Sequence, residues 1–195
     1  MKNLRFLAPF VFALLASGLP AFAQKNDPEI KKIDAGFVDT PKYQFSGTKD
    51  KRSTPGQWLE VEVEFASKAP IQEEVTMRVH VVFNQMMAAN KYFTGEVTYI
   101  NVLEGPSKFG VMYIAPGSLK LVDNGKVPTA NDIKEIGVEL LIKGAVVHQA
   151  NFKEAKNGTW WTQMQPLQGH VLNKNQTPFA PLFWDRYEQI KIEGR

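Results

Sequence analysis

Apolar and polar residues alternate along two segments in the first half of the chain. Leu59, Val61, Val63 and Phe65 occupy every second position, with charged residues between them. The same period of two returns in residues 75–83. Because successive side chains of a β-strand point to opposite faces, this alternation predicts two antiparallel strands, each with one buried face.

Turn residues divide the rest of the chain into shorter strand candidates. Residues 30–38 fit an edge strand, and residues 138–142 and 146–152 fit a hairpin that turns at Lys143-Gly144. The stretch 84–93 lacks β-branched residues and predicts a short helical turn or a crossover.

The later segments are also short and rich in turn signals. Residues 95–103 and 109–115 predict a second hairpin, because Glu104-Gly105-Pro106-Ser107 lies between them. Residues 160–162 and 171–172 are further strand candidates. The pattern predicts an all-β protein, an immunoglobulin-like antiparallel β-sandwich of about seven or eight strands, with a small ligand-holding barrel as the alternative.

Residues 1–23 have the pattern of a secretory signal peptide. Lys2 and Arg5 precede a short apolar run, and Ala21-Phe22-Ala23 places small residues at a cleavage site. We therefore expect residues 24–195 to form a single β-sandwich domain with extended terminal segments. The expected location is the periplasm or the cell surface of a Gram-negative bacterium, with no membrane insertion after cleavage.

Composition narrows the classes of function. The chain has no cysteine, which excludes disulfides, thiolate metal sites and a lipid anchor on cysteine. It carries 23 Lys+Arg and 20 Asp+Glu, and loss of Lys2 and Arg5 leaves 21 against 20. So balanced a surface does not indicate nucleic-acid binding.

Motifs for catalysis or metal binding are weak. Ser46-Gly47-Thr48-Lys49 matches a Ser-x-x-Lys pattern, but the companion motifs of penicillin-recognising enzymes are missing. His148 shares a strand face with apolar residues, which favours a hydrogen-bonded core or rim histidine, whereas His80 lies on a polar face and is expected to be solvated. The acidic row of Glu60, Glu62 and Glu64 is expected to be a solvated face. We expect no catalytic site, cofactor or metal.

Tryptophans offer candidate contacts for a partner or a sugar. Trp160 and Trp161 are adjacent, so on a strand they face opposite sides and at least one ring lies outside the main core. Trp184 lies in the C-terminal segment. Large aromatic residues are nevertheless more often core or interface anchors than glycan platforms.

The stretch 95–115 is apolar on both faces, which indicates that both are covered. Ile100, Val102, Met112 and Ile114 form the candidate interaction face. A partner protein is one possible cover. The C-terminal segment from residue 177 onward is the favoured one, because it is rich in large apolar side chains.

Several segments resemble a known family. They are Trp58–Phe65, Thr94–Tyr99, Val111–Tyr113 and, most specifically, Asn173–Tyr187. Together these segments are similar to small secreted pilus-like proteins of verrucomicrobial bacteria, whose genes lie beside type IV pilus assembly components. The resemblance implies an immunoglobulin-like sandwich and no catalytic motif. Because the apolar N-terminal run is expected to be removed, it implies an accessory role rather than that of a major pilin.

These observations favour a non-enzymatic secreted protein that acts by protein–protein contact. Its expected partners are pilus-assembly or envelope proteins. A glycan- or apolar-ligand-binding envelope module is the main alternative, and an unrecognised envelope enzyme is a third hypothesis.

Overall fold

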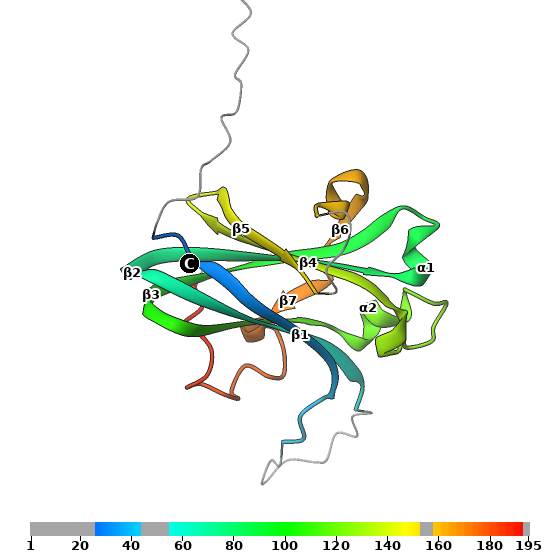
Figure 1. Cartoon of the computed structure of the whole chain (residues 1–195). Helices are drawn as coiled ribbons and strands as arrows, with labels where there is room; N and C mark the ends of the chain where they lie inside the picture. The colour runs from blue at the N-terminus through cyan, green and yellow to red at the C-terminus, as the bar shows by residue number, and fades with distance from the viewer. Residues whose placement is uncertain (1–25, 44–54, 153–157, 193–195) are drawn as a thin grey trace, which may run out of the picture.

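Two long strands form the framework of the computed structural model, which describes residues 26–43, 55–152 and 158–192. Strand β2 (Gln57–Phe83) and strand β3 (Lys91–Ile114) pair antiparallel, with register irregularities only between Phe65 and Ile71. At these irregularities both ribbons bend back toward the other end of the molecule (Figure 1). Each long strand therefore contributes one half to each of two packed layers.

The shorter strands extend these two layers. Strands β1 (Glu29–Asp39) and β7 (Val171–Asn173) flank the first half of β2 and the second half of β3. In the other layer, β5 (Ala145–Asn151), β4 (Ile133–Ile142) and β6 (Gln165–Gln168) extend the remaining halves. The pair β3–β6 is parallel, and the other pairs are antiparallel. The predicted all-β, immunoglobulin-like sandwich is confirmed, with seven strands in the described residues.

Helical segments are short. They are α1 (Asn84–Met87), α2 (Pro116–Lys120), η1 (Ala130–Asp132), η2 (Trp160–Gln163) and η3 (Lys174–Gln176). The helical turn expected after residue 83 is confirmed. No helix in the described part of the chain is long and apolar enough to cross a membrane.

Alternating side chains of the two layers meet in one main core. Leu59 and Val61 from the first layer, and Val79 and Val81 from the second, are fully buried. Between the layers, the Tyr99 hydroxyl accepts a 2.9 Å hydrogen bond from the Val111 N–H. The period of two in the sequence thus identifies the inward row of both halves of β2 correctly.

The β4–β5 hairpin is confirmed, and it brings one side of the sandwich together. Its turn residues Lys143 and Gly144 have φ angles of 50° and 81°, the left-handed conformation that a type I′ hairpin turn requires. Across this side, the Ile30 N–H donates to Nδ1 of His148 at 3.3 Å. His148 is therefore the hydrogen-bonded rim histidine that the sequence predicted.

The predicted hairpin over residues 95–115 is wrong. Its two segments pair with different halves of β2 instead of with each other. Met112 lies opposite Val61, and Ile114 lies opposite Leu59. Pairing with the buried row of β2 decides which side chains of this segment point inward.

The candidate interaction face is wrong for the same reason. Val102, Met112 and Ile114 are fully buried in the main core, and Ile100 is half-buried with its N–H bonded to the Gln189 carbonyl. Between Ile100 and Val102, Asn101 has a φ of 54° and interrupts the regular alternation of the strand. These four residues do not form an exposed surface.

The outward-pointing residues of the second half of β3 form an apolar face, and the C-terminal segment covers it. Val111 and Tyr113 form a second apolar cluster with Trp58 and with Phe179 from the C-terminal segment. The Phe179 ring stacks on Tyr113 with centroids 4.4 Å apart and planes 4° apart. The favoured expectation, that the tail covers an apolar outer face of this region, is correct, although the covered row is Val111 and Tyr113.

Candidate functional site

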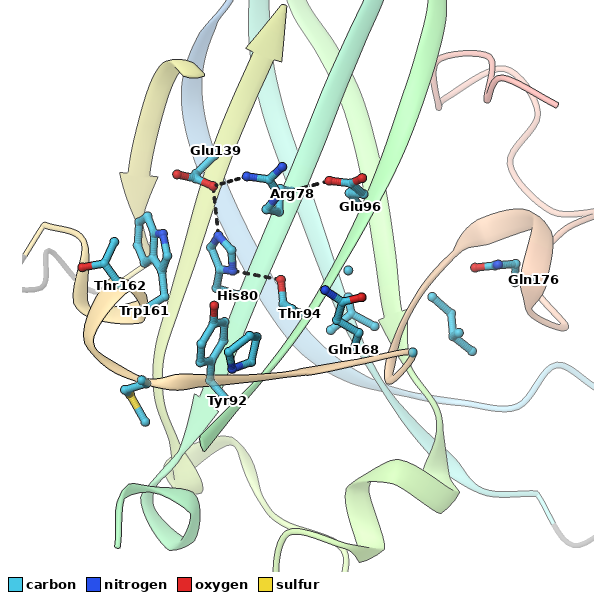
Figure 2. Close-up of a pocket in the computed structure, with 16 residues that line it drawn as sticks. Arg78, His80, Tyr92, Thr94, Glu96, Glu139, Trp161, Thr162, Gln168 and Gln176 are labelled. Atoms are coloured by element: carbon cyan, nitrogen blue, oxygen red, sulfur yellow. Dashed lines mark hydrogen bonds and ion pairs between the residues drawn. The ribbon is translucent and has the colours of Figure 1, made fainter. Parts of the chain in front are cut away.

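A cleft of about 800 Å³ lies on the outer face of the second layer. Its floor comes from β2, β3 and β4, and its walls come from the segment that runs from η2 through β6 to β7 (Figure 2). This wall segment, residues 160–173, is called the strap below. Because β6 pairs with β3 in one layer and β7 pairs with β3 in the other, the strap also closes the second side of the sandwich.

A glycine in β4 makes room for the strap. Gly137 is the pairing neighbour of His80, and a Cβ atom at Gly137 would clash with the Trp161 ring. In this slot the indole of Trp161 stacks on the His80 imidazole, with centroids 4.7 Å apart and planes 18° apart. The Tyr92 ring meets His80 edge-on, at 5.5 Å. One histidine therefore holds the strap against the sheet.

Five polar side chains form a chain of contacts across the floor of the cleft (Figure 2). The Thr94 hydroxyl lies 2.9 Å from Nδ1 of His80, and Nε2 of His80 lies 3.1 Å from Oε2 of Glu139. Arg78 donates to the same Glu139 oxygen and to Glu96, each at 3.1 Å. The chain joins three neighbouring strands.

The protonation state of His80 follows from its surroundings. Burial lowers the pKa of His80 below its usual 6.5 despite the Glu139 carboxylate, so the ring is neutral at neutral pH. The charged carboxylate accepts the hydrogen on Nε2, which leaves Nδ1 to accept the Thr94 hydroxyl. The prediction that His80 is solvated is wrong, because the strap covers this face and leaves the residue 2 % exposed.

The ion pairs of the cleft are partly shielded from water. Burial would raise the pKa of Glu139, but hydrogen bonds from His80 and Arg78 and the positive charge of Arg78 outweigh it and lower that pKa. For Arg78, burial opposes ionisation, while the carboxylates of Glu96 and Glu139 raise its pKa. The cleft thus holds one fixed positive charge between two carboxylates and presents them beside the Trp161 and Tyr92 rings.

The order Thr94–His80–Glu139 resembles a catalytic triad, but the threonine is poorly placed for attack. Thr94 is 7 % exposed, and its hydroxyl also lies 3.1 Å from the Val79 carbonyl. A nucleophile needs access to the reacting atom in addition to a base. The arrangement is better suited to binding polar groups. In the described residues, no three His, Asp or Glu side chains gather as a metal site would require.

A second feature is the C-terminal segment over the acidic row of β2. Arg186 donates to both Glu62 oxygens, at 2.5 and 2.8 Å, and the Tyr187 hydroxyl donates to Glu62 at 2.8 Å. Glu60 accepts from the Tyr113 hydroxyl at 2.9 Å. The hydrogen bonds from Arg186 lower the pKa of Glu62, whereas burial raises that of Glu60. The expectation of a solvated acidic face is wrong, since these carboxylates are half-buried anchors.

Two aromatic rings project from this anchored segment. Phe183 is 58 % exposed and Trp184 is 74 % exposed. Phe183 has a φ of 55°, which is unusual for an aromatic residue and strains the backbone. Phe183 borders an apolar hollow of about 390 Å³ with Val38, Pro41 and Leu182. This set of four residues and the hollow is called the Phe183 surface.

The three candidate tryptophan contacts have different environments. Trp161 is buried in the core, and Trp160 is half-buried against it. The strand predicted for residues 160–162 is wrong. These residues form η2, in which the Thr162 hydroxyl donates to the Thr159 carbonyl. The rings therefore do not face opposite sides of a sheet, and only Trp184 of the three is exposed. Residues 1–23 and 46–49 lie outside the described residues.

The cleft itself was not anticipated from the sequence. Arg78 and His80 occupy the polar row of a predicted strand, and Glu139 lies between apolar residues of another. A charged residue inside an apolar strand was the available signal. It did not reveal that the distant strap would enclose all three.

Comparison with known proteins agrees with this fold. A family model matches residues 20–194, which is most of the chain. The chain belongs to the family that this model describes. Its fold also occurs in a crystal structure of a protein from the verrucomicrobial bacterium Akkermansia muciniphila, with a TM-score of 0.70 and 22% sequence identity. The match covers 86% of this chain and 94% of that chain. No curated protein matches the chain.

Proposed function

We propose that this family member is a non-enzymatic exported protein that acts by protein–protein contact in a type IV pilus-associated assembly. It acts in the periplasm or at the cell surface of a Gram-negative bacterium, and its partners are pilus-assembly or envelope proteins. The pilus association comes from the sequence resemblance, whose most specific block is Asn173–Tyr187.

The observation that carries the proposal is the Phe183 surface, to which that block contributes Leu182 and Phe183. The ring of Phe183 is 58 % exposed at a strained backbone position beside an apolar hollow. Backbone strain of this kind costs about 1–3 kcal/mol and is found most often at functional sites. Exposed aromatic residues next to apolar pockets are typical anchors of protein interfaces.

The base of this surface is rigid. Arg186 and Tyr187 bind Glu62, and Phe179 stacks on Tyr113, so both neighbours of the exposed loop are fixed to the first layer. A rigid base reduces the entropy lost when a partner binds. The cleft is less suited to a catalytic role, because Thr94 is buried.

Crosslinking in the native envelope tests the proposal. A photoreactive amino acid replaces Phe183 in one variant and Leu121, which is 68 % exposed on another part of the molecule, in the control. Crosslinked proteins are identified by mass spectrometry. Pilus-assembly components joined to position 183 and absent from position 121 support the proposal. Equal crosslinking from both positions, or crosslinks only to unrelated proteins, would contradict it.

A further inference from the structure

The cleft is one end of a longer groove along β3. Glu96 and Gln176 border both the cleft and a second hollow of about 460 Å³. Ile190 and Ile192 border that second hollow and a third one of about 320 Å³, which reaches Trp184. Three hollows that share lining residues thus follow one another from Trp161 in the strap to Trp184 in the C-terminal segment, and this row of hollows is called the groove below.

The groove is lined by side chains that can both donate and accept hydrogen bonds. Gln168 lies at the cleft end, Gln176 where the first two hollows meet, and Asn175 between the second and third. All three are exposed. A primary amide offers two donors and an acceptor, which matches a hydroxyl group that donates and accepts at once. The Gln176 oxygen already accepts the Asn173 N–H at 3.0 Å, so this side chain contributes chiefly its donors.

The charges of the cleft and the second hollow favour a neutral ligand, and in the third hollow the Lys174 ammonium donates to the Ala180 carbonyl at 2.8 Å. Arg78 is paired with Glu96 and Glu139, each at 3.1 Å, and Lys191 is paired with Glu74 at 2.5 Å. Every charged side chain that borders the cleft and the second hollow thus has an opposite charge beside it. An ionic ligand would have to displace one of these partners, whereas a neutral polar ligand can use their remaining hydrogen-bonding positions.

The edge of β3 is occupied on both sides of residues 95–97, which leaves an extended peptide little room to pair. Strand β6 already pairs with residues 91–94. Beyond it, the Ile100 N–H donates to the Gln189 carbonyl at 2.9 Å, and the Lys191 N–H donates to the Thr98 carbonyl at 2.7 Å. Peptides that add a strand to a sheet need free backbone groups at its edge. Recognition in this groove therefore depends mainly on side chains.

We infer that this groove binds a neutral oligosaccharide chain. The amides of Gln168, Gln176 and Asn175 bind sugar hydroxyl groups, and the Trp184 ring stacks against a sugar face at the far end. One side of the ring lies near the Lys174 ammonium, whose nitrogen is 5.1 Å from the centroid, and the ring is 74 % exposed. This inference goes beyond the proposed function, because Trp184 and the amides do not border the hollow of the Phe183 surface, although Phe183 also borders the third hollow of the groove.

Calorimetric titration with three neutral hexasaccharides, built from glucose, N-acetylglucosamine or galactose, tests the inference. At least one should bind the full chain. Trp184→Ala and Gln168→Ala, at opposite ends of the groove, should each weaken that binding by about tenfold, equivalent to about 1.4 kcal/mol. Trp184→Phe keeps an aromatic face and should retain most of the affinity. Thermal melting of each variant verifies that it is folded.

Two results would overturn the inference. One is the absence of binding for all three sugars at millimolar concentration. The other is binding that neither alanine variant weakens. An uncharged peptide that binds in the groove and is lost in both variants would assign it to a peptide instead. Leu182 belongs to the Phe183 surface and borders none of the three hollows of the groove. Leu182→Ala should therefore leave sugar binding unchanged, so failure here is distinguishable from failure of the proposed protein contact.

Discussion

The indole of Trp161 stacks on the imidazole of His80, although the two residues are 81 positions apart in the sequence. The contact exists because Gly137, beside His80 on the next strand, leaves room for the ring. Through it, a segment outside the long strands becomes the wall of the cleft. The stability of the strap should therefore depend on the glycine and on the state of the histidine.

Substitution of Gly137 by alanine should loosen the strap. The added Cβ clashes with the Trp161 ring, and such overpacking costs about 1–3 kcal/mol of unfolding free energy. Gly36→Ala is the matched control, because Gly36 also lies in a strand and a Cβ there meets nothing within 4 Å. Urea unfolding should show a change within about 0.5 kcal/mol for the control. Equal stability of the two variants would contradict the claim that Gly137 makes room for the Trp161 ring.

The protein should lose stability as the pH falls below about 6.5, the ordinary pKa of histidine. Burial lowers the pKa of His80 in the folded state, so below this pH the unfolded chain binds more protons. Stability is then fully present above the unfolded pKa and declines by up to about 1.4 kcal/mol per pH unit for one group. Burial lowers the pKa of His148 in the same direction.

Unfolding curves between about pH 6.5 and the onset of carboxylate titration separate the two histidines. His80→Gln should remove a larger part of the slope than His148→Gln, because His80 is fully buried and His148 is half-buried. A slope unchanged in His80→Gln would show that this histidine is not held neutral.

The C-terminal segment should be part of the folded domain. Phe179→Ala removes the ring that stacks on Tyr113 and should cost about 3 kcal/mol. It should also expose Val111 and Trp58 and promote self-association, measurable by light scattering. Phe183→Ala is the control, since that ring is exposed and its loss should change stability by no more than about 0.5 kcal/mol. Equal effects of the two changes would mean that the tail does not cover the second cluster.

Substitution by lysine at the adjacent β3 positions Val102 and Leu103 should have opposite effects on folding. Val102 is fully buried, so Val102→Lys places a charge in the main core and should prevent folding into a soluble domain. Leu103 is 56 % exposed, and Leu103→Lys should fold normally. Circular dichroism of the two purified variants provides the test. A folded Val102→Lys protein would restore the idea that this row is a surface.

Local patterns predicted the strands well, because the period of two depends only on neighbouring residues. They correctly gave the inward row Leu59, Val61, Val63 and Phe65 and the hairpin at Lys143-Gly144. They failed for residues 95–115, where alternation alone cannot tell which row faces the core. Pairing of Met112 with Val61 on a distant strand decides that question.

The cleft was missed for a related reason. His80 has the alternation of a solvated position, and only the strap, about eighty residues later, buries it. The same holds for Glu62, whose partners Arg186 and Tyr187 come from the end of the chain. Contacts between residues so far apart in the sequence leave no local signal. Trp184 could be predicted as a candidate contact because its exposure does not depend on a distant partner.

The most direct test of the proposed function is a binding measurement with the pilus-assembly component crosslinked at position 183. Its affinity is measured for the unmodified protein, for Phe183→Ala and for the control Leu121→Ala. Loss of an interface anchor should weaken binding by about thirtyfold, equivalent to about 2 kcal/mol. The account predicts this loss for Phe183→Ala alone. Equal affinity of the two variants would contradict it.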